Sequence, residues 1–452
     1  MFTTQPFMSR RAALRSLICG SALMPGIVQS LLAQSGEDTV NPLAPKTTHF
    51  PGKAKRVIFL FMPGGVSHID SFDPKPRLKE LSPDGKKYLP AFWDFKRGGK
   101  CGTEVSDLFP YMRDCMDDVC LIRSLHGDHN DHAQATLGIH TGSVTFARPS
   151  MGSWVSYGMG TTNQNLPSFV VLAPKLPYAG SQVWSSDFLP GAHAGTRVLA
   201  GAEPIPDLNR RAPSARVQEL ELGLLEKINQ KHQQNRVSDP MLAARIKSFE
   251  TAFGMQSAMP DVLDLSKETD ATLKLYGLER GSTKGFAWQC LVARRMVERG
   301  VRFVELIDVG SSNNWDAHGN MKGHAPLARN VDQPIAGLLK DLKSRGMLED
   351  TLVVWTSEFG RTPTPDSPDG RSHQASVYSS WLAGGGVKPG IIYGASDEIG
   401  RKPAENPVHV HDFHATILHS LGFNHEKLTY NHGGRDYRLT DVFGNVVKDI
   451  LV

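Results

Sequence analysis

The sequence predicts an α/β fold, with a mostly parallel sheet sandwiched between helices. Apolar runs recur along the chain, and loops rich in glycine, histidine or acidic residues follow them. This pattern is typical of buried parallel strands. The runs are Arg56–Met62, Val119–Ile122, Phe169–Leu172, Val301–Ile307 and Thr351–Trp355. Amphipathic helices are expected over Lys284–Arg299 and Ala325–Arg345. This alternation of strands and helices is typical of a parallel sheet covered on both faces.

The N-terminus has the pattern of an export signal. Arg10 and Arg11 form a twin-arginine pair, and a moderately apolar stretch follows over Ser16–Ala33. Glycine, proline and glutamine interrupt this stretch, so no permanent membrane span is expected. We therefore expect residues 1–33 to be a Tat-type signal peptide read by the Tat export machinery, and residues 34–55 to be a linker. The protein would be exported, periplasmic or extracellular.

Charge and length limit what the remaining chain can be. Lys+Arg number 50 and Asp+Glu 46 in 452 residues, a net charge of +4. Three arginines of the signal (Arg10, Arg11, Arg15) account for most of this excess, and no block of five or six like charges occurs. Nucleic acid is therefore not expected as a partner. One large α/β domain is predicted over residues 56–452.

A helical insertion is predicted within this domain, over residues 211–276. Two helices are expected there, and the second begins at Asp239-Pro240, an N-cap followed by proline at the first helical position. Apolar residues recur at helical spacing in both: Val217, Leu220, Leu224 and Ile228, then Leu242, Ile246, Phe249 and Phe253. We expect this pair to pack as a cap on the α/β body.

The loops after the expected strands carry the residues suited to catalysis. The first strand is followed by PGGVSHIDSFDPKP, which contains Asp70. After the second strand comes SLHGDHNDHAQATLGIHTG, with four histidines at 126, 129, 132 and 140 and a helix start expected near Asn130 or Asp131. Since the carboxyl ends of parallel strands share one edge of a sheet, these side chains can converge. A hydrogen-bonded polar loop is the alternative.

Carboxylate and imidazole recur together further along. Asp316 and His318 follow the strand that ends at Ile307, with His324 six residues on, and His373 lies in GRSHQ. This ligand set suits zinc, manganese or iron, whereas calcium prefers more oxygens. We expect a divalent metal ion, with the number of ions open and the identity open among zinc, manganese and calcium. A loop pair without metal is the alternative.

Buried charges also need partners. Glu358 lies at the carboxyl end of the buried strand that begins at Thr351. An unpaired carboxylate would be energetically costly there, so a metal or Arg361 should face it. His411 and His414 share one face of a later helix, where capping and packing are the simpler explanation. The four cysteines after the signal match no zinc or redox spacing. A disulfide among Cys101, Cys115 and Cys120, or buried free thiols, are both open.

Several stretches together resemble the bacterial family called domain of unknown function 1501, which is related to sulfatases and alkaline phosphatases. They include FMPGGVSHIDSFDPKP, WDAHGN, DQPIAGLLKDLKSRGMLEDTLVVWTSEFGRTP and VHVHDFHATILHSLG, and they span Lys55 to Val452. The resemblance implies an alkaline-phosphatase-like fold. It places Asp316, His318 and His373 at one metal site and Glu358 at a second, where Phe359 replaces the usual histidine. Asp70 is a possible substitute for the aspartate of the first strand.

The resemblance does not supply a nucleophile. No cysteine begins a Cys-x-Pro-x-Arg motif, and counting back from Thr141-Gly142 leads to His132.

Two functions are compatible with these sequence features. The first is a metal-dependent hydrolase of phosphate or sulfate esters, acting on an anionic small molecule or polysaccharide. In it His132 or Glu358 would be catalytic, and Arg361 and Arg371 would bind the anion. The second is a non-catalytic exported protein on the same scaffold that binds anionic surface polymers or partner proteins.

Overall fold

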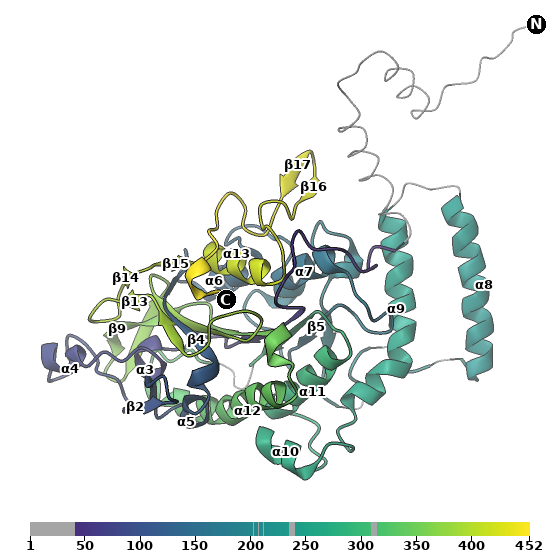
Figure 1. The fold of residues 1–452 in the computed structure, drawn as a ribbon. Helices are drawn as coiled ribbons and strands as arrows, with labels where there is room; N and C mark the ends of the chain where they lie inside the picture. The colour runs from purple at the N-terminus through teal and green to yellow at the C-terminus, as the bar shows by residue number, and fades with distance from the viewer. Residues whose placement is uncertain (1–40, 202, 207, 211, 235–239, 309–313) are drawn as a thin grey trace, which may run out of the picture.

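The computed structural model describes residues 41–201, 203–206, 208–210, 212–234, 240–308 and 314–452 (Figure 1). Arg10, Arg11 and the rest of the expected signal therefore lie outside the described residues. None of the described helices combines the length and the apolar character that a membrane crossing requires.

A nine-stranded sheet forms the centre of the molecule and confirms the predicted α/β class. All its pairings are parallel except those of β11, which runs antiparallel to both neighbours. Along the sheet the strands are β12 (Ile391–Tyr393), β4 (Val119–His126), β11 (Tyr378–Ala383), β8 (Thr351–Thr356), β1 (Arg56–Phe61), β7 (Phe303–Ile307), β5 (Phe169–Leu172) and β6 (Thr196–Val198), with β15 (Val408–His409) beside β4.

Helices cover both faces of this sheet (Figure 1). Alternate residues of β1 point to opposite sides: Ile58 and Leu60 join one buried cluster, Val57 and Phe59 the other. On the first side pack α5 (Pro110–Arg113), α10 (Asp270–Tyr276), α11 (Phe286–Glu298) and α12 (His324–Ser344). On the second side pack α6 (His132–Thr141), α7 (Met151–Met159) and α13 (Val410–Ser420). Strands β1, β5, β7 and β8 are therefore buried on both faces, which explains their continuous apolar runs.

Four small two-stranded sheets stand outside the central one. They pair β2 (Phe95–Gly98) with β3 (Thr103–Ser106), β9 (Gly360–Ser367) with β10 (Gly370–Gln374), β13 (Ala395–Ser396) with β14 (Pro403–Glu405), and β16 (Tyr430–His432) with β17 (Arg435–Tyr437). Two short helices, α3 (His68–Ser71) and α4 (Arg77–Leu81), follow β1. The four described cysteines are free thiols, so the disulfide considered among three of them is not formed.

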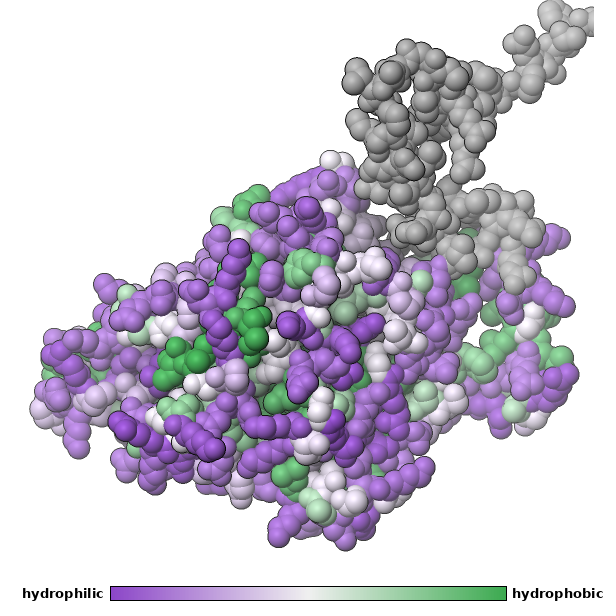
Figure 2. All heavy atoms as spheres, in the orientation of Figure 1, coloured by the Kyte–Doolittle hydropathy of each residue, from purple (hydrophilic) through white to green (hydrophobic). Residues whose placement is uncertain are grey.

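The middle of the chain forms the helix pair α8 (Ala215–Gln234) and α9 (Pro240–Leu263), which stand side by side in Figure 1. The C-terminal part of α9 packs on the body through Met255, Met259 and Val262. The apolar stripe of α8 does not pack as we expected, because Leu220 and Leu224 are 59% and 62% exposed. Green atoms mark this region at the right of Figure 2. Helix α8 contacts α9 rather than capping the body.

Candidate functional site

Four side chains from distant segments converge near the carboxyl ends of the central strands. Asp316 and His318 lie in the loop between β7 and α12, His373 lies on β10, and His132 is the first residue of α6. Ligand atoms of Asp316, His132 and His373 lie within 4.8 Å of one another. We call these four residues the Asp316 cluster. The convergence follows from topology, since β1, β4, β7 and β8 end at the same edge.

The glycine turn after β1 lets the loop of Asp316 lie directly against the sheet. Gly64 has a φ of 111°, and a Cβ atom there would come within 2.5 Å of the Trp315 nitrogen. The Trp315 amide donates to the Pro63 carbonyl at 3.0 Å, and its fully buried ring stacks on Phe109. A larger residue at position 64 would displace the segment that carries Asp316.

The imidazoles of His318 and His373 direct the lone pairs of their Nε2 atoms toward each other. His318 Nδ1 donates to Asp366 Oδ2 at 2.5 Å, and His373 Nδ1 donates to the Asn130 carbonyl at 2.7 Å. In the neutral rings both Nε2 atoms are therefore acceptors, yet they lie 2.7 Å apart. Asp316 Oδ1 lies 3.2 and 3.3 Å from them. Three acceptors around one point need a proton or a cation between them, and a divalent ion fits this donor set.

The charge around the cluster also favours a cation. The group holds three carboxylates, those of Asp316, Glu358 and Asp366, but one guanidinium, that of Arg361. Its net charge is −2 when the histidines are neutral and −1 when one of them is protonated. Burial alone would raise the pKa of Asp316. Its hydrogen bonds with His132, His373 and Arg361 outweigh burial and hold that pKa well below its usual range. Asp316 is thus ionised at any physiological pH.

Glu358 orients His132 instead of pointing into the cluster. Its Oε1 accepts from His132 Nδ1 at 2.6 Å and from the Gly64 amide at 2.8 Å, and its Oε2 accepts from Ser357 Oγ at 3.0 Å. The side chain is fully buried. With its oxygens occupied in this way, Glu358 is better suited to position His132 than to bind a metal or act as a base, the roles suggested for it from sequence.

His132 turns its second nitrogen toward the cluster. His132 Nε2 is buried and faces Asp316 Oδ2 at 3.3 Å, with no other polar partner. Burial would lower the pKa of His132, but its hydrogen bonds to Asp316 and Glu358 outweigh burial and raise the pKa to about 9. The ring stacks on Tyr178 with centroids 4.1 Å apart. Without a cation on Asp316, His132 is therefore protonated at neutral pH.

Arg361 is a structural residue of this site. It is fully buried, and its donors reach the carbonyls of Gly64, Gly65 and Arg371 and the carboxylate of Asp316, the last at 2.5 Å. These contacts use four of its five N–H groups, and the fully buried side chain is not open to a substrate anion. The anion-binding role expected from sequence does not fit this geometry. A buried guanidinium is costly unless its donors are hydrogen-bonded, so these protein partners cannot readily be exchanged for a substrate. Arg361 instead fixes Asp316 against the turn after β1.

Asp70 and Arg371 satisfy each other away from the cluster. Arg371 Nε donates to Asp70 Oδ2 at 2.8 Å, and both side chains are fully buried. The remaining donors of Arg371 reach four backbone carbonyls, those of Leu89, Pro90, Thr362 and Pro363. Asp70 also accepts from Ser67 Oγ and the Phe92 amide. Neither the metal-ligand role proposed for Asp70 nor the anion-binding role proposed for Arg371 fits these contacts.

Two other histidines of the motifs, His324 and His140, are buried and hydrogen-bonded within the protein interior. His324 is fully buried at the start of α12, where its Nε2 accepts the Ser67 amide at 3.2 Å. His140 Nε2 donates to Glu305 Oε1 at 2.8 Å beneath the sheet. Sequence reasoning missed two residues that shape the site, Asp366 and Tyr178. Asp366 lies four residues beyond the TSEFGRT motif, and Tyr178 lies in none of the motifs. Only the fold brings Asp366 to His318 and Tyr178 to His132.

The chain belongs to the family described as protein of unknown function DUF1501, whose sequence profile matches residues 54–451. The family resemblance of the motifs is thereby confirmed. No curated protein matches the chain significantly.

The solved structures to which the chain is similar include hydrolases and a synthase. Alkaline phosphatase from the Antarctic bacterium TAB5 is 13% identical, with a TM-score of 0.37 over 82% of this chain and 99% of that one. The PsFucS1 sulfatase from Pseudoalteromonas sp. is 12% identical, with a TM-score of 0.34 over 89% and 71%. The lipoteichoic acid synthase LtaP from Listeria monocytogenes is 10% identical, with a TM-score of 0.36 over 91% and 80%.

Proposed function

We propose that this DUF1501 protein is a metal-dependent hydrolase of phosphate or sulfate esters. The observation that carries the proposal is the facing pair of imidazoles: His318 Nε2 and His373 Nε2 lie 2.7 Å apart, beside Asp316 Oδ1. Each ring is held in the tautomer that leaves this nitrogen free, by a carboxylate in one case and a carbonyl in the other. Such outer hydrogen bonds are what orient histidine ligands in metal sites.

The residues of the chain divide the work as follows. Asp316, His318 and His373 would hold the ion. When bound, the ion supplies the charge that polarises an ester oxygen and lowers the pKa of a water molecule. His132 Nε2 would accept a proton from that water, because Glu358 fixes the ring through Nδ1 and turns Nε2 toward Asp316 and the ion's position. Arg361 would keep Asp316 in place without touching the substrate.

Replacement of His132 tests the reaction. His132→Ala should lower kcat/KM on p-nitrophenyl phosphate, bis(p-nitrophenyl) phosphate or p-nitrophenyl sulfate by about 10²–10⁴-fold, the usual contribution of a general base. Bound metal should remain at the wild-type level, because the other three residues of the cluster are intact. The exposed His232 on α8 offers a matched control, and His232→Ala should leave turnover unchanged.

Two results would contradict the hydrolase. One is a metal-loaded wild-type chain that turns over none of these esters, which would favour a protein that only binds anionic polymers. The other is full activity in His132→Ala.

We also propose that the protein is exported through the Tat machinery, on the strength of Arg10 and Arg11 in the sequence. An Arg10→Lys, Arg11→Lys double variant should accumulate inside the cell, measured by immunoblotting of fractions. Export of the double variant at the wild-type level would argue against this route.

A further inference from the structure

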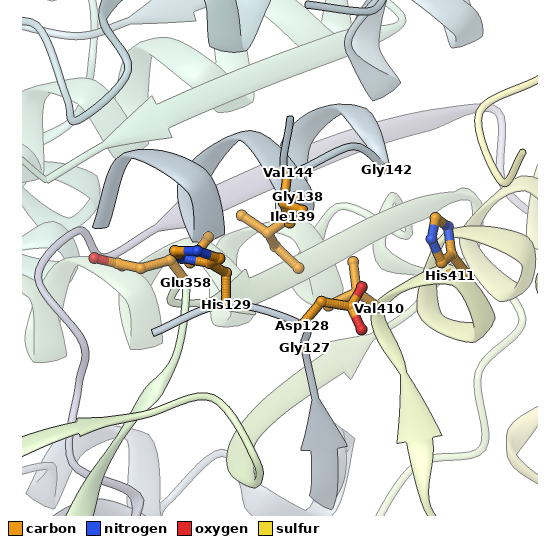
Figure 3. Close-up of a pocket in the computed structure, with 11 residues that line it drawn as sticks. Gly127, Asp128, His129, Gly138, Ile139, Gly142, Val144, Glu358, Val410 and His411 are labelled. Atoms are coloured by element: carbon orange, nitrogen blue, oxygen red, sulfur yellow. The ribbon is translucent and has the colours of Figure 1, made fainter. Parts of the chain in front are cut away.

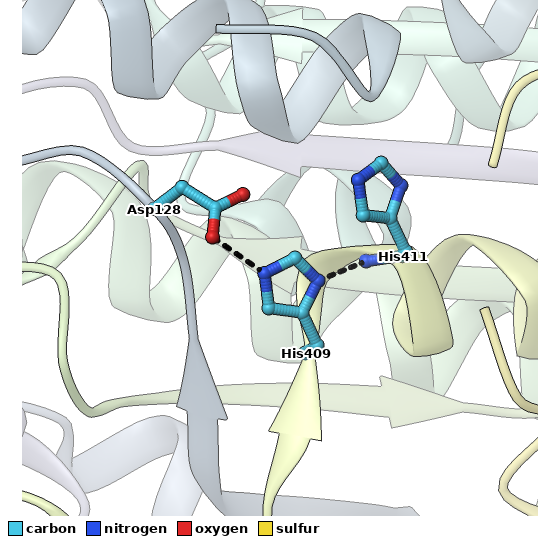
Figure 4. Close-up of side chains that lie close together, drawn as sticks. All are labelled: Asp128, His409 and His411. Atoms are coloured by element: carbon cyan, nitrogen blue, oxygen red, sulfur yellow. Dashed lines mark hydrogen bonds and ion pairs between the residues drawn. The ribbon is translucent and has the colours of Figure 1, made fainter. Parts of the chain in front are cut away.

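A second group of metal-ligating side chains lies near the C-terminal end of α6, where His411 approaches Gly142, whereas the Asp316 cluster lies at the N-terminal end of this helix. Asp128 follows β4, His409 ends β15, and His411 lies in the first turn of α13 (Figure 4). One ligand atom from each lies within 4.8 Å of the others. We propose that these three residues, the Asp128 cluster, bind a second divalent ion of the zinc class.

The fold holds these three residues together by regular structure. β15 pairs in parallel with β4, and His409 lies opposite His126 in the register, so Asp128 follows just beyond. His409 is also the N-cap of α13, and Asp412 closes the capping box by accepting the His409 amide at 3.0 Å. Asp412 is thereby occupied, since its other oxygen accepts the Asn445 amide at 2.7 Å. It orders the site without being one of its ligands.

His411 is the observation that points to a ligand. Its residue is only 6% exposed, yet Nδ1 is buried and has no hydrogen-bond partner. An imidazole nitrogen buried in this way is costly unless something binds it. The ring lies beside that of His409, with centroids 5.0 Å apart. Figure 4 shows the Asp128 carboxylate joined to the His409 ring by a hydrogen bond, with the His411 ring at the start of α13 beside them.

Metal binding requires one proton to move within His409. At present Nδ1 accepts the His411 amide at 3.2 Å, so the ring proton lies on Nε2 and is donated to Asp128 Oδ1 at 3.0 Å. An ion between Nε2 and Asp128 takes the place of that proton. The proton passes through solvent to Nδ1, and the ring stays neutral. The hydrogen bond from the His411 amide to Nδ1, which caps the helix, is lost. The ion must therefore bind tightly enough to offset one helix-capping hydrogen bond.

The ligand set and the surroundings indicate the kind of ion. Two imidazoles and one carboxylate suit zinc and its neighbours, and three protein ligands leave one coordination position open. A cavity of about 560 Å³ adjoins the cluster, lined also by Glu426, Phe443 and Asn445. The open position can thus take water or a small oxygen ligand from solvent.

This site is separate from the Asp316 cluster. Between them lies an enclosed cavity of only about 20 Å³, lined by Gly138 and Ile139 of α6 (Figure 3). Glu358, the partner of His132, borders this cavity on one side and His411 on the other, and the two clusters have no residue in common. Variants at the two clusters should therefore act independently.

Zinc binding to the full chain tests the inference, measured by calorimetry and by metal analysis. Asp128→Asn and His411→Ala should each remove one equivalent of zinc or weaken its binding at least tenfold, while His318→Ala should leave this equivalent in place. His232→Ala controls for surface histidines. Because Asp128 has a 56% exposed side chain, Asp128→Asn should fold even if His411→Ala does not.

Zinc stoichiometry and affinity unchanged in Asp128→Asn would overturn the inference. The outcome is independent of the first site, because a chain that binds zinc only at the Asp128 cluster would still lose that equivalent in this variant.

Discussion

Alanine in place of His318 is expected to remove the ion from the Asp316 cluster and to lower ester turnover by at least about 10²-fold. Residues that merely orient metal ligands contribute 10–100-fold, so a ligand itself should contribute no less. The His318 side chain is 41% exposed, so its loss should leave the fold intact. Metal analysis and kcat/KM on the same preparation measure both effects.

Asp366→Asn supplies a graded comparison for this prediction. It keeps His318 but weakens the bond that holds its tautomer, and should cost about 10–100-fold in metal affinity. Full metal content and full activity in His318→Ala would contradict the ligand assignment.

Methionine in place of Arg371 is expected to lower the free energy of unfolding by about 3–5 kcal/mol, because Asp70 would be left as a buried charge without its partner. Urea denaturation at neutral pH measures the change. The double variant Asp70→Asn, Arg371→Met should lose less than the sum of the two single changes, as expected for residues in direct contact.

The same variant separates a structural role from anion binding. If Arg371 bound substrate, Arg371→Met would keep its stability and raise KM. Wild-type stability combined with a raised KM would therefore overturn our interpretation of this pair.

The strands with unbroken apolar sequences could be predicted closely, because burial on both faces leaves a strong pattern. Phe169–Leu172 is strand β5 at the predicted residues, and the run from Thr351 extends by one residue to Thr356. Strand β11 was not predicted, since two serines interrupt its apolar sequence. Ser380 Oγ shares a hydrogen bond with Thr356 Oγ1 at 2.6 Å, and this pairing across strands makes a buried serine tolerable.

The location of the candidate site could be predicted from the sequence, but the roles of its individual residues could not. Parallel strands end at one edge, so the loops carrying Asp316 and His132 could be expected to meet. The partner of each buried charge could not be predicted. Glu358 pairs with His132, and Asp70 with Arg371, through contacts between segments more than 200 residues apart. The exposed stripe of α8 was also unexpected, since helical periodicity does not show whether another surface covers an apolar face.

The most direct test of the metal-dependent site is a crystal structure of the chain loaded with zinc, with anomalous diffraction recorded at the zinc edge. We expect an anomalous peak bounded by Asp316 Oδ1, His318 Nε2 and His373 Nε2, at about 2.0–2.2 Å from each. No peak at this position, with the two imidazoles still facing each other across a proton, would contradict the account.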